Sequence, residues 1–184
     1  MMHSEVDGLH LHDFEIHVDI WGQLEIDKLL QGTEHAVNSD KLSIRAPFYP
    51  FNTDGIDPSG RNILIERVNI TNFDDAVAIK PTYYGHHGVY DMNCTENVMV
   101  RDMVIHQSLG LSVGSVHADN FTNCVRNVTF KDSKLYNPFK GIYIKTNSND
   151  TYIVPSGGGV ISDITYENIE IHNPKWWGIY IGPQ

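Results

Sequence analysis

Short runs of alternating hydrophobic and polar residues recur along most of the chain. One run, at 62–70, alternates on both sides of a polar kink, and comparable runs follow at 97–105, 127–135 and 163–171. A weaker copy lies at 9–16. Alternation with a period of two predicts β-strands with one buried face. We therefore expect each copy to form two short strands joined at the kink.

A further strand closes each repeat, and no helical periodicity separates the two sets of strands. These closing strands are expected at 42–47, 76–79, 111–114, 142–145 and 179–181. A short recurring unit made only of strands is typical of coils that stack into a solenoid. The predicted fold class is therefore all-β, a right-handed single-stranded parallel β-helix. Equivalent positions of successive coils would lie roughly 4.8 Å apart, the spacing between paired strands.

The repeats continue along the chain, so we expect one β-helix domain covering 1–184. Strand-like alternation begins by Leu9, and the chain stops just after another strand, so the solenoid is expected to be incomplete at both ends and to be a fragment of a longer enzyme. Turn residues at 81–88 and 147–159 predict inserted loops that wall one face. The segment 21–40 fits the repeat poorly and is expected to be loop with some strand.

The charge of the chain restricts its partners. A formal net charge of −10 argues against nucleic acid and anionic membrane surfaces. No apolar run approaches the roughly 18 residues of a membrane span. We expect no nucleic-acid or membrane partner, and an acidic polysaccharide would need a local basic patch.

Two features indicate a secreted glycoprotein, although the first residues lack the order of a signal peptide. Cys94 and Cys124 each lie three residues before a repeat, so they occupy the same place in adjacent coils, where a disulfide is within reach. Two free buried thiols are the alternative. Oxidised cysteines are typical of extracellular proteins. Asparagines of Asn-x-Ser/Thr sequons point the same way: Asn69, Asn93, Asn120, Asn127 and Asn149.

Stacking brings three acidic residues to one face. Asp54 follows the strand expected at 42–47, and Asp74 and Asp75 lie at the corresponding edge of the next coil. Crowded carboxylates resist simultaneous ionisation, so one pKa rises while its neighbour stays low. Glycosidic hydrolysis needs one protonated and one ionised carboxyl. A turn or helix cap is the alternative for an adjacent Asp pair, and calcium binding is another use of the cluster.

At this point the chain resembles the polygalacturonase family of glycoside hydrolases. The similarity runs from about Leu42 to the end. It rests on four motifs in order, at 52–55, 74–75, 110–115 and 141–145. The resemblance implies a right-handed parallel β-helix that cleaves pectic, galacturonate-containing polysaccharide with inversion. It also implies that Asp74 is the general acid and that Asp54 and Asp75 activate the water.

The motifs depart from the family pattern at two positions. Leu109 takes the place of a histidine that tunes the acid, and Tyr143 takes the place of an arginine that holds a substrate carboxylate. Lys145 keeps its motif position and is expected to bind that carboxylate. Tyr143 can stack on a sugar or donate one hydrogen bond, but it cannot replace a guanidinium. A divergent member is indicated, acting on a galacturonate-containing or a neutral glycan.

Other residues complete the expected substrate face. Asn52 and Ser112 belong to the matched motifs and are expected to bind substrate, although filling space between coils explains Ser112 equally well. Trp176, Trp177 and Tyr180 could form a wall on which a sugar stacks, with packing in the core or at the edge of a coil as the alternative for at least one of the tryptophans. Four histidines could supply the missing imidazole but are not expected to be catalytic: His86, His87, His106 and His117.

The leading interpretation is thus an inverting glycoside hydrolase that acts as a monomer on a polysaccharide substrate, with no cofactor and no metal. Two alternatives remain. A catalytically silent glycan-binding β-helix is favoured by the replacements at Leu109 and Tyr143. A calcium-dependent polysaccharide lyase is disfavoured because no arginine lies in register to act as base. The full-length protein is expected to be secreted.

Overall fold

The computed structural model describes residues 6–18, 52–82, 94–117, 123–146 and 158–183. Every regular element in these segments is a β-strand. No helix long and apolar enough to cross a membrane occurs in them. The strands are β1 (Val6–His17), β2 (Gly60–Asn72), β3 (Asp75–Ile79), β4 (Thr95–Arg101), β5 (Val104–Gln107), β6 (Gly110–Val116), β7 (Asn123–Tyr136), β8 (Lys140–Thr146), β9 (Gly159–His172) and β10 (Trp177–Pro183).

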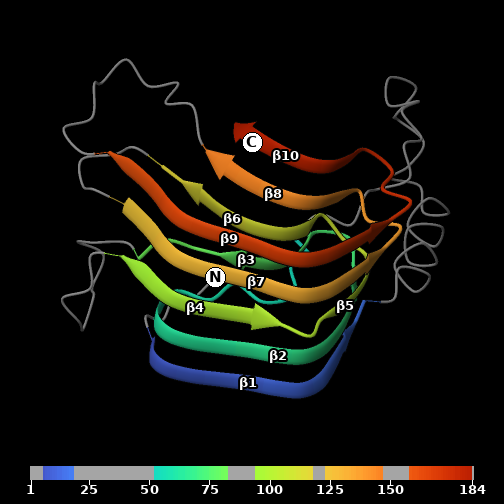
Figure 1. Ribbon diagram of the computed structural model, residues 1–184, viewed down its shortest axis with the longest axis horizontal. Coiled ribbons are helices and arrows are strands. Elements are labelled where there is room, and N and C mark those ends of the chain that lie inside the picture. Colours follow the sequence, from blue (N-terminus) through green and yellow to red (C-terminus); the bar gives the residue numbers. More distant parts are fainter. Residues whose placement is uncertain (1–5, 19–51, 83–93, 118–122, 147–157, 184) are drawn as a thin grey trace, which may run out of the picture.

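The described strands form two sheets, and the paired strands in both run parallel. One sheet contains β1, β2, β4, β5, β7 and β9, and the other has the order β10-β8-β6-β3. Figure 1 shows the strands as a stack that runs from β1, in blue, to β10, in red. Successive coils contribute one strand region to each sheet, which confirms the predicted parallel β-helix.

The register between coils matches the repeats seen in the sequence. Leu9 pairs with Ile63, Ile63 with Val98, Val98 with Val128, and Val128 with Ile164. The weak first copy is therefore a true coil. Because each residue pairs with the equivalent residue of the next repeat, each inward position stacks on a residue of the same kind.

Residues with left-handed backbone angles form the kinks. Glycine, asparagine and aspartate adopt a positive φ at the lowest cost, which explains the polar residues at most of the kinks, with Arg67 as an exception. In four of the five copies the kink bends the strand without ending it, so β1, β2, β7 and β9 are single strands of 12 to 14 residues rather than the expected pairs. Only the copy at 97–105 divides, into β4 and β5. The kink residues that stack at this corner have φ between 49° and 57°: Asp13, Arg67, Asp102, Asp132 and Asn168.

Asparagine side chains link the coils at the other kink of this sheet. The amide of Asn97 donates to Asn62 over 3.2 Å, and the amide of Asn127 donates to Asn97 over 2.7 Å. Each such bond contributes about 1 kcal/mol net. Asn127 therefore uses the amide of its sequon within the fold, whereas Asn69 of β2 is exposed.

The core fills the space between the sheets with columns of apolar side chains. One column passes through Ile65, Val100 and Phe130, all fully buried, and the Phe130 ring stacks on Tyr166 at 4.7 Å. Burying a side chain of this size contributes roughly 1.5–3 kcal/mol. On β10 the corresponding inward residues, such as Ile179, are exposed.

One buried carboxylate connects the first three coils. Glu66 of β2 has a side chain only 5% exposed, and it accepts hydrogen bonds from Arg101 at 2.8 Å and from His10 at 3.1 Å. Hydrogen bonds from Arg101 and then Arg67 lower the pKa of Glu66 to about 2. This carboxylate is therefore ionised near neutral pH.

Cys94 and Cys124 are joined by a disulfide, with their Cα atoms 4.6 Å apart. Cys94 directly precedes β4, and Cys124 lies near the start of β7, so the bond joins adjacent coils. It closes a loop of 30 residues. The bond limits how far the unfolded chain can separate these coils.

Replacing both cysteines with serine is expected to lower the free energy of unfolding by about 3–4 kcal/mol, because the unfolded chain gains the entropy of an open loop. Urea unfolding followed by circular dichroism measures the change. An unchanged midpoint would contradict a stabilising disulfide. The unreduced native chain, titrated with a thiol reagent, serves as the control and should show no free thiol.

Candidate active site

Three carboxyl groups meet on the face formed by β3, β6 and β8. One carboxylate oxygen from each of Asp54, Asp74 and Asp75 lies within 4.8 Å of the other two. Strand pairing produces this contact, because Gly55 donates its N–H to the Asp75 carbonyl at 2.9 Å and the next residue bridges to β3. A side chain on Gly55 would collide with the Ala76 carbonyl. The set can move protons or hold a hard cation.

Asp75 is the most buried of the three acids. Its carboxylate is fully inaccessible and receives the Ser112 hydroxyl at 2.6 Å and the Lys145 ammonium. These three side chains come from adjacent coils, on β3, β6 and β8. A buried carboxylate is tolerated when a paired cation and further hydrogen bonds satisfy it. Asp75 is therefore held in place by donors from two other coils.

Asp74 is held mainly by backbone groups. Its carboxylate oxygens accept the N–H of Asn52 and the N–H of Asp75, each at 2.9 Å. Its own carbonyl accepts the Ser108 hydroxyl at 2.9 Å and the Leu109 N–H at 2.7 Å. The side chain is only partly buried, so it is oriented and still open to a ligand.

Asp54 has the most strongly perturbed acidity of the three. Burial, followed by the nearby charges of Asp57, Asp74 and Asp75, raises its pKa to about 6. Burial also raises the pKa of Asp57, against the opposing effect of Lys80, whose ammonium lies 3.5 Å from the Asp57 carboxylate. The site therefore contains one carboxyl that changes protonation near pH 6 beside another that is paired with a lysine and a serine.

Comparison with known proteins identifies the family of the chain. The sequence model of the family named glycosyl hydrolases family 28 matches residues 23–184. This chain belongs to that family.

Several relatives and a solved structure are similar to the chain. A polygalacturonase of Fusarium fujikuroi is 29% identical over 96% of this chain and 42% of its own length. An endo-polygalacturonase of Pectobacterium parmentieri is 34% identical over 76% of this chain and 32% of its own. Endopolygalacturonase I from Stereum purpureum, solved with two galacturonate, has a TM-score of 0.54 and 26% identity over 71% of this chain and 32% of that one. The chain thus spans less than half the length of these relatives.

Within this family 28 chain, the residues expected to bind substrate contact the acid cluster. Lys145 is only 3% exposed and lies against Asp75 instead of standing free on the face. Ser112 is buried and hydrogen-bonded to the same carboxylate. Asn52 contributes a backbone N–H to Asp74. All three therefore hold the acids in the present arrangement.

Tyr143 belongs to an aromatic group at the end of the face. Its ring lies 5.4 Å from Tyr180, and Tyr180 lies 5.2 Å from Trp177. Tyr143 is 3% exposed, whereas Trp177 is about half exposed. Trp176 packs against Phe139 at 5.1 Å. Both tryptophans are about half exposed, and Trp177 is the one whose ring joins the group of Tyr143 and Tyr180.

The histidines divide between described and undescribed segments. His106 stacks on Tyr136 at 5.3 Å, and the carbonyl of His117 accepts the Asn123 amide at 3.0 Å. His86 and His87 lie outside the described residues, as do the strand expected at 42–47 and most of the two inserted loops. These contacts of His106 and His117 lie outside the acid cluster.

Lys140, at the start of β8, is a residue that sequence reasoning missed. It is only 9% exposed, and its ammonium lies 3.4 Å from the centre of the Tyr143 ring. Its register partner is Trp177. The sequence placed Lys140 immediately before the fourth motif, which could have drawn attention to it. Its surroundings could not be inferred, because the rings of Trp177 and Tyr180 belong to another coil.

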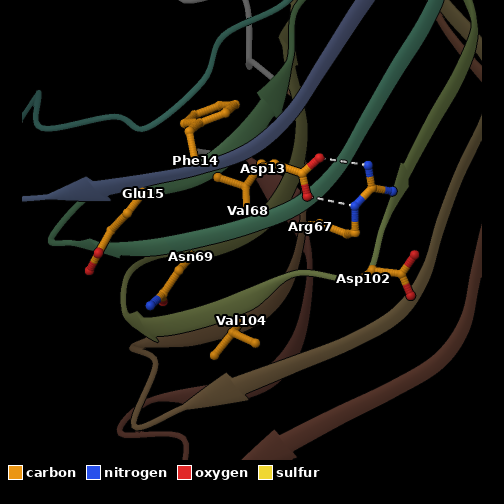
Figure 2. Close-up of a pocket in the computed structure, with 8 residues that line it drawn as sticks. All are labelled: Asp13, Phe14, Glu15, Arg67, Val68, Asn69, Asp102 and Val104. Atoms are coloured by element: carbon orange, nitrogen blue, oxygen red, sulfur yellow. Dashed lines mark hydrogen bonds and ion pairs between the residues drawn. The ribbon is translucent and has the colours of Figure 1, made fainter.

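A separate groove lies at the kinks of the first coils, and Figure 2 shows the side chains that line it. Arg67 and Asp13 form a bidentate ion pair there, with bonds of 2.7 and 2.9 Å. The groove shares no residue with the acid cluster. Its paired charges and the partly exposed Phe14 and Val104 make it a weaker candidate for catalysis.

Asp54→Asn is expected to stabilise the fold above pH 6 and to have little effect at pH 3.5. A carboxyl with a raised pKa favours the native state when protonated, and this advantage is lost as the pH rises from 3.8 through about 6. The gain at pH 7.5 should be about 1 kcal/mol, less than the full shift implies, because the group is partly exposed to solvent.

Thermal unfolding at the two pH values measures this difference. Asp163→Asn is the matched control, because Asp163 is exposed and has a left-handed φ of 54° that asparagine also adopts. An equal effect of Asp54→Asn at both pH values would contradict the raised pKa.

Proposed function

We propose that the protein hydrolyses glycosidic bonds in pectic, galacturonate-containing polysaccharide by general acid–base catalysis. The observation that carries this proposal is the contact of three carboxyl groups, within 4.8 Å of one another, in a chain of family 28. Similar proteins bear the name polygalacturonase. A protonated and an ionised carboxyl at one scissile bond are the minimum that such a reaction needs.

In this mechanism Asp74 protonates the leaving oxygen, and Asp54 with Asp75 activates the attacking water. Asp75 is suited to orient that water because Lys145 and Ser112 hold its carboxylate in place. Asp54 is suited to take the proton because its pKa of about 6, raised by burial, makes it a stronger base than an ordinary carboxylate. The partly buried Asp74 is open to the leaving group.

We further propose that the reaction inverts the anomeric carbon. The spacing of the carboxylates alone would favour retention, because inverting enzymes commonly separate theirs by roughly 6.5–9.5 Å. Retention, however, requires one carboxylate to attack the sugar as a nucleophile. Asp75 is fully inaccessible and occupied by two donors, which supports a role beside a water molecule instead.

The proposed setting is extracellular, with the protein acting as a monomer on its polysaccharide without a cofactor. The disulfide supports an oxidising compartment. The exposed sequon asparagine Asn69 is compatible with glycosylation there.

A silent glycan-binding β-helix is the second candidate. One observation favours it: the Lys145 ammonium, which keeps its motif position, is taken up by Asp75 instead of facing a ligand. Binding of oligogalacturonate without release of reducing ends would support this candidate.

Asp74→Asn is expected to reduce hydrolysis of polygalacturonate at least about 100-fold with the fold intact, because it removes the proton donor. The rate is measured from the reducing ends that hydrolysis releases, and Asp163→Asn serves as the control. Undiminished activity would remove Asp74 from the mechanism. Absorbance of an unsaturated product would instead indicate the lyase. The anomer first formed, read by proton NMR, separates inversion from retention.

The pH profile tests the role of Asp54. If Asp54 is the base, kcat/KM falls below about pH 6, where this carboxyl becomes protonated. A fall above about pH 6 instead would make Asp54 the acid and exchange its role with Asp74. The profile of Asp54→Asn should lack that limb in either case.

A further inference from the structure

Lys140 is a nearly buried cation without an anion. The residue is 9% exposed and forms no ion pair with any residue in the described segments. Lys145, the other strongly buried lysine there, is paired with Asp75. An ammonium group removed from water is costly unless a negative group compensates it. Among the described residues, no negative group therefore pairs with the charge of Lys140.

Three aromatic rings surround the Lys140 ammonium. Its nitrogen lies 3.4 Å from the centre of the Tyr143 ring, 4.7 Å from that of Tyr180 and 5.8 Å from that of Trp177. Ring faces attract a cation, and this attraction strengthens where water is excluded. The rings hold the ammonium in place, but their faces are poor acceptors for its three N–H groups. Those donors remain available to an oxyanion.

The position of Lys140 links it to the acid cluster. Gly110 pairs with Asp75, and a side chain on Gly110 would collide with the carbonyl oxygens of Lys140 and Gly141. Lys140 thus lies one coil beyond the neighbour of Asp75. Burial lowers the pKa of Lys140, and the charges of Asp75 and Asp74 oppose that shift. The lysine and the acids therefore act on one another electrostatically.

This position suits a negatively charged sugar. An oligosaccharide with its scissile bond at Asp74 that ran along the stacked coils would bring a neighbouring unit towards Lys140 and Trp177. A carboxylate on that neighbouring sugar unit would pair with the Lys140 ammonium. No ion pair with a described residue would have to break first. A neutral hexose or a methyl ester would leave the ammonium uncompensated, and sites with unpaired buried polar groups reject such ligands strongly.

We propose that Lys140, framed by Tyr143, Tyr180 and Trp177, binds the carboxylate of a galacturonate unit beside the scissile bond. The half-exposed face of Trp177 stacks on the sugar. This inference rests on the proposed function for the position of the scissile bond. It gives the chain a cation in place of the arginine that Tyr143 replaces, and it predicts selectivity for free over esterified galacturonate.

The test compares Lys140→Met with Lys175→Met. Methionine keeps the length of the side chain without its charge. Lys175 is the matched control, because its ammonium also lies over a ring, that of Phe139 at 5.0 Å, but the residue is exposed and outside the acid cluster. Calorimetry, with each variant in an Asp74→Asn background, measures binding of trigalacturonate, its methyl ester and its carboxyl-reduced form.

Lys140→Met is expected to weaken binding of trigalacturonate by at least about 10-fold and to leave the reduced trimer unchanged. Lys175→Met should change neither. In the active chain, Lys140→Met should raise KM for polygalacturonate with little change in kcat. Equal binding of trigalacturonate by Lys140→Met and its parent would overturn the inference, as would a parent that binds acid and ester equally.

The outcomes separate this inference from the proposed function. Hydrolysis of polygalacturonate that does not depend on Lys140 leaves the function standing and removes the inference. Lys140-dependent binding of trigalacturonate without hydrolysis removes the function and retains the inference. Near-UV circular dichroism monitors folding. Should Lys140→Met fail to fold, Lys140→Arg, which keeps the charge, and the acid-to-ester ratio of the parent decide the matter.

Discussion

Hydrogen bonding between parallel coils is the constraint on which the rest of this structure depends. Each coil must lie one strand spacing from the next, so side chains at equivalent positions are in contact whatever their distance in the sequence. Columns of isoleucine and valine satisfy this constraint inside the helix, and asparagines such as Asn97 satisfy it at the kinks. The same constraint forces carboxyl groups together on the outer face, where water is partly excluded.

The charges on that face are unevenly compensated. Asp75 is satisfied by Lys145 and Ser112, and Asp74 by two backbone N–H groups. Asp54 has no comparable set of donors among the described residues, and its pKa rises because burial and its acidic neighbours oppose its ionisation. Lys140 has the opposite sign, and within the described segments it contacts aromatic rings but forms no ion pair. A ligand that brings a carboxylate and a water molecule would relieve both.

The two departures from the family pattern have different structural meanings. Leu109 still donates its backbone N–H to the Asp74 carbonyl, so the position continues to hold the acid although an imidazole is absent. Tyr143 loses a guanidinium but provides a ring face for Lys140. The first change removes a titrating group from the site. The second moves the positive charge along the same strand, β8, from position 143 to Lys140.

The repeat, the strands and the meeting of the three acids could be predicted from the sequence, because a period-two pattern with a recurring unit leaves few ways to bury its apolar face. Polar residues at the kinks could also be located, since their left-handed conformation restricts the residue type. The sequence pattern predicted more strand breaks than occur, however. A single left-handed residue such as Asp132 bends the strand, while the hydrogen bonds to the next coil continue on both sides of it.

By itself, then, the sequence determined the stacking order and therefore which residues share a face. Only the tertiary structure decided how the charges on that face pair. Lys145, expected to bind substrate, lies against Asp75. Lys140, which lies outside the motifs, is surrounded by aromatic rings from two coils. The physical reason is that register fixes positions along a strand, whereas the partner of a long side chain depends on packing and solvent exclusion around its end.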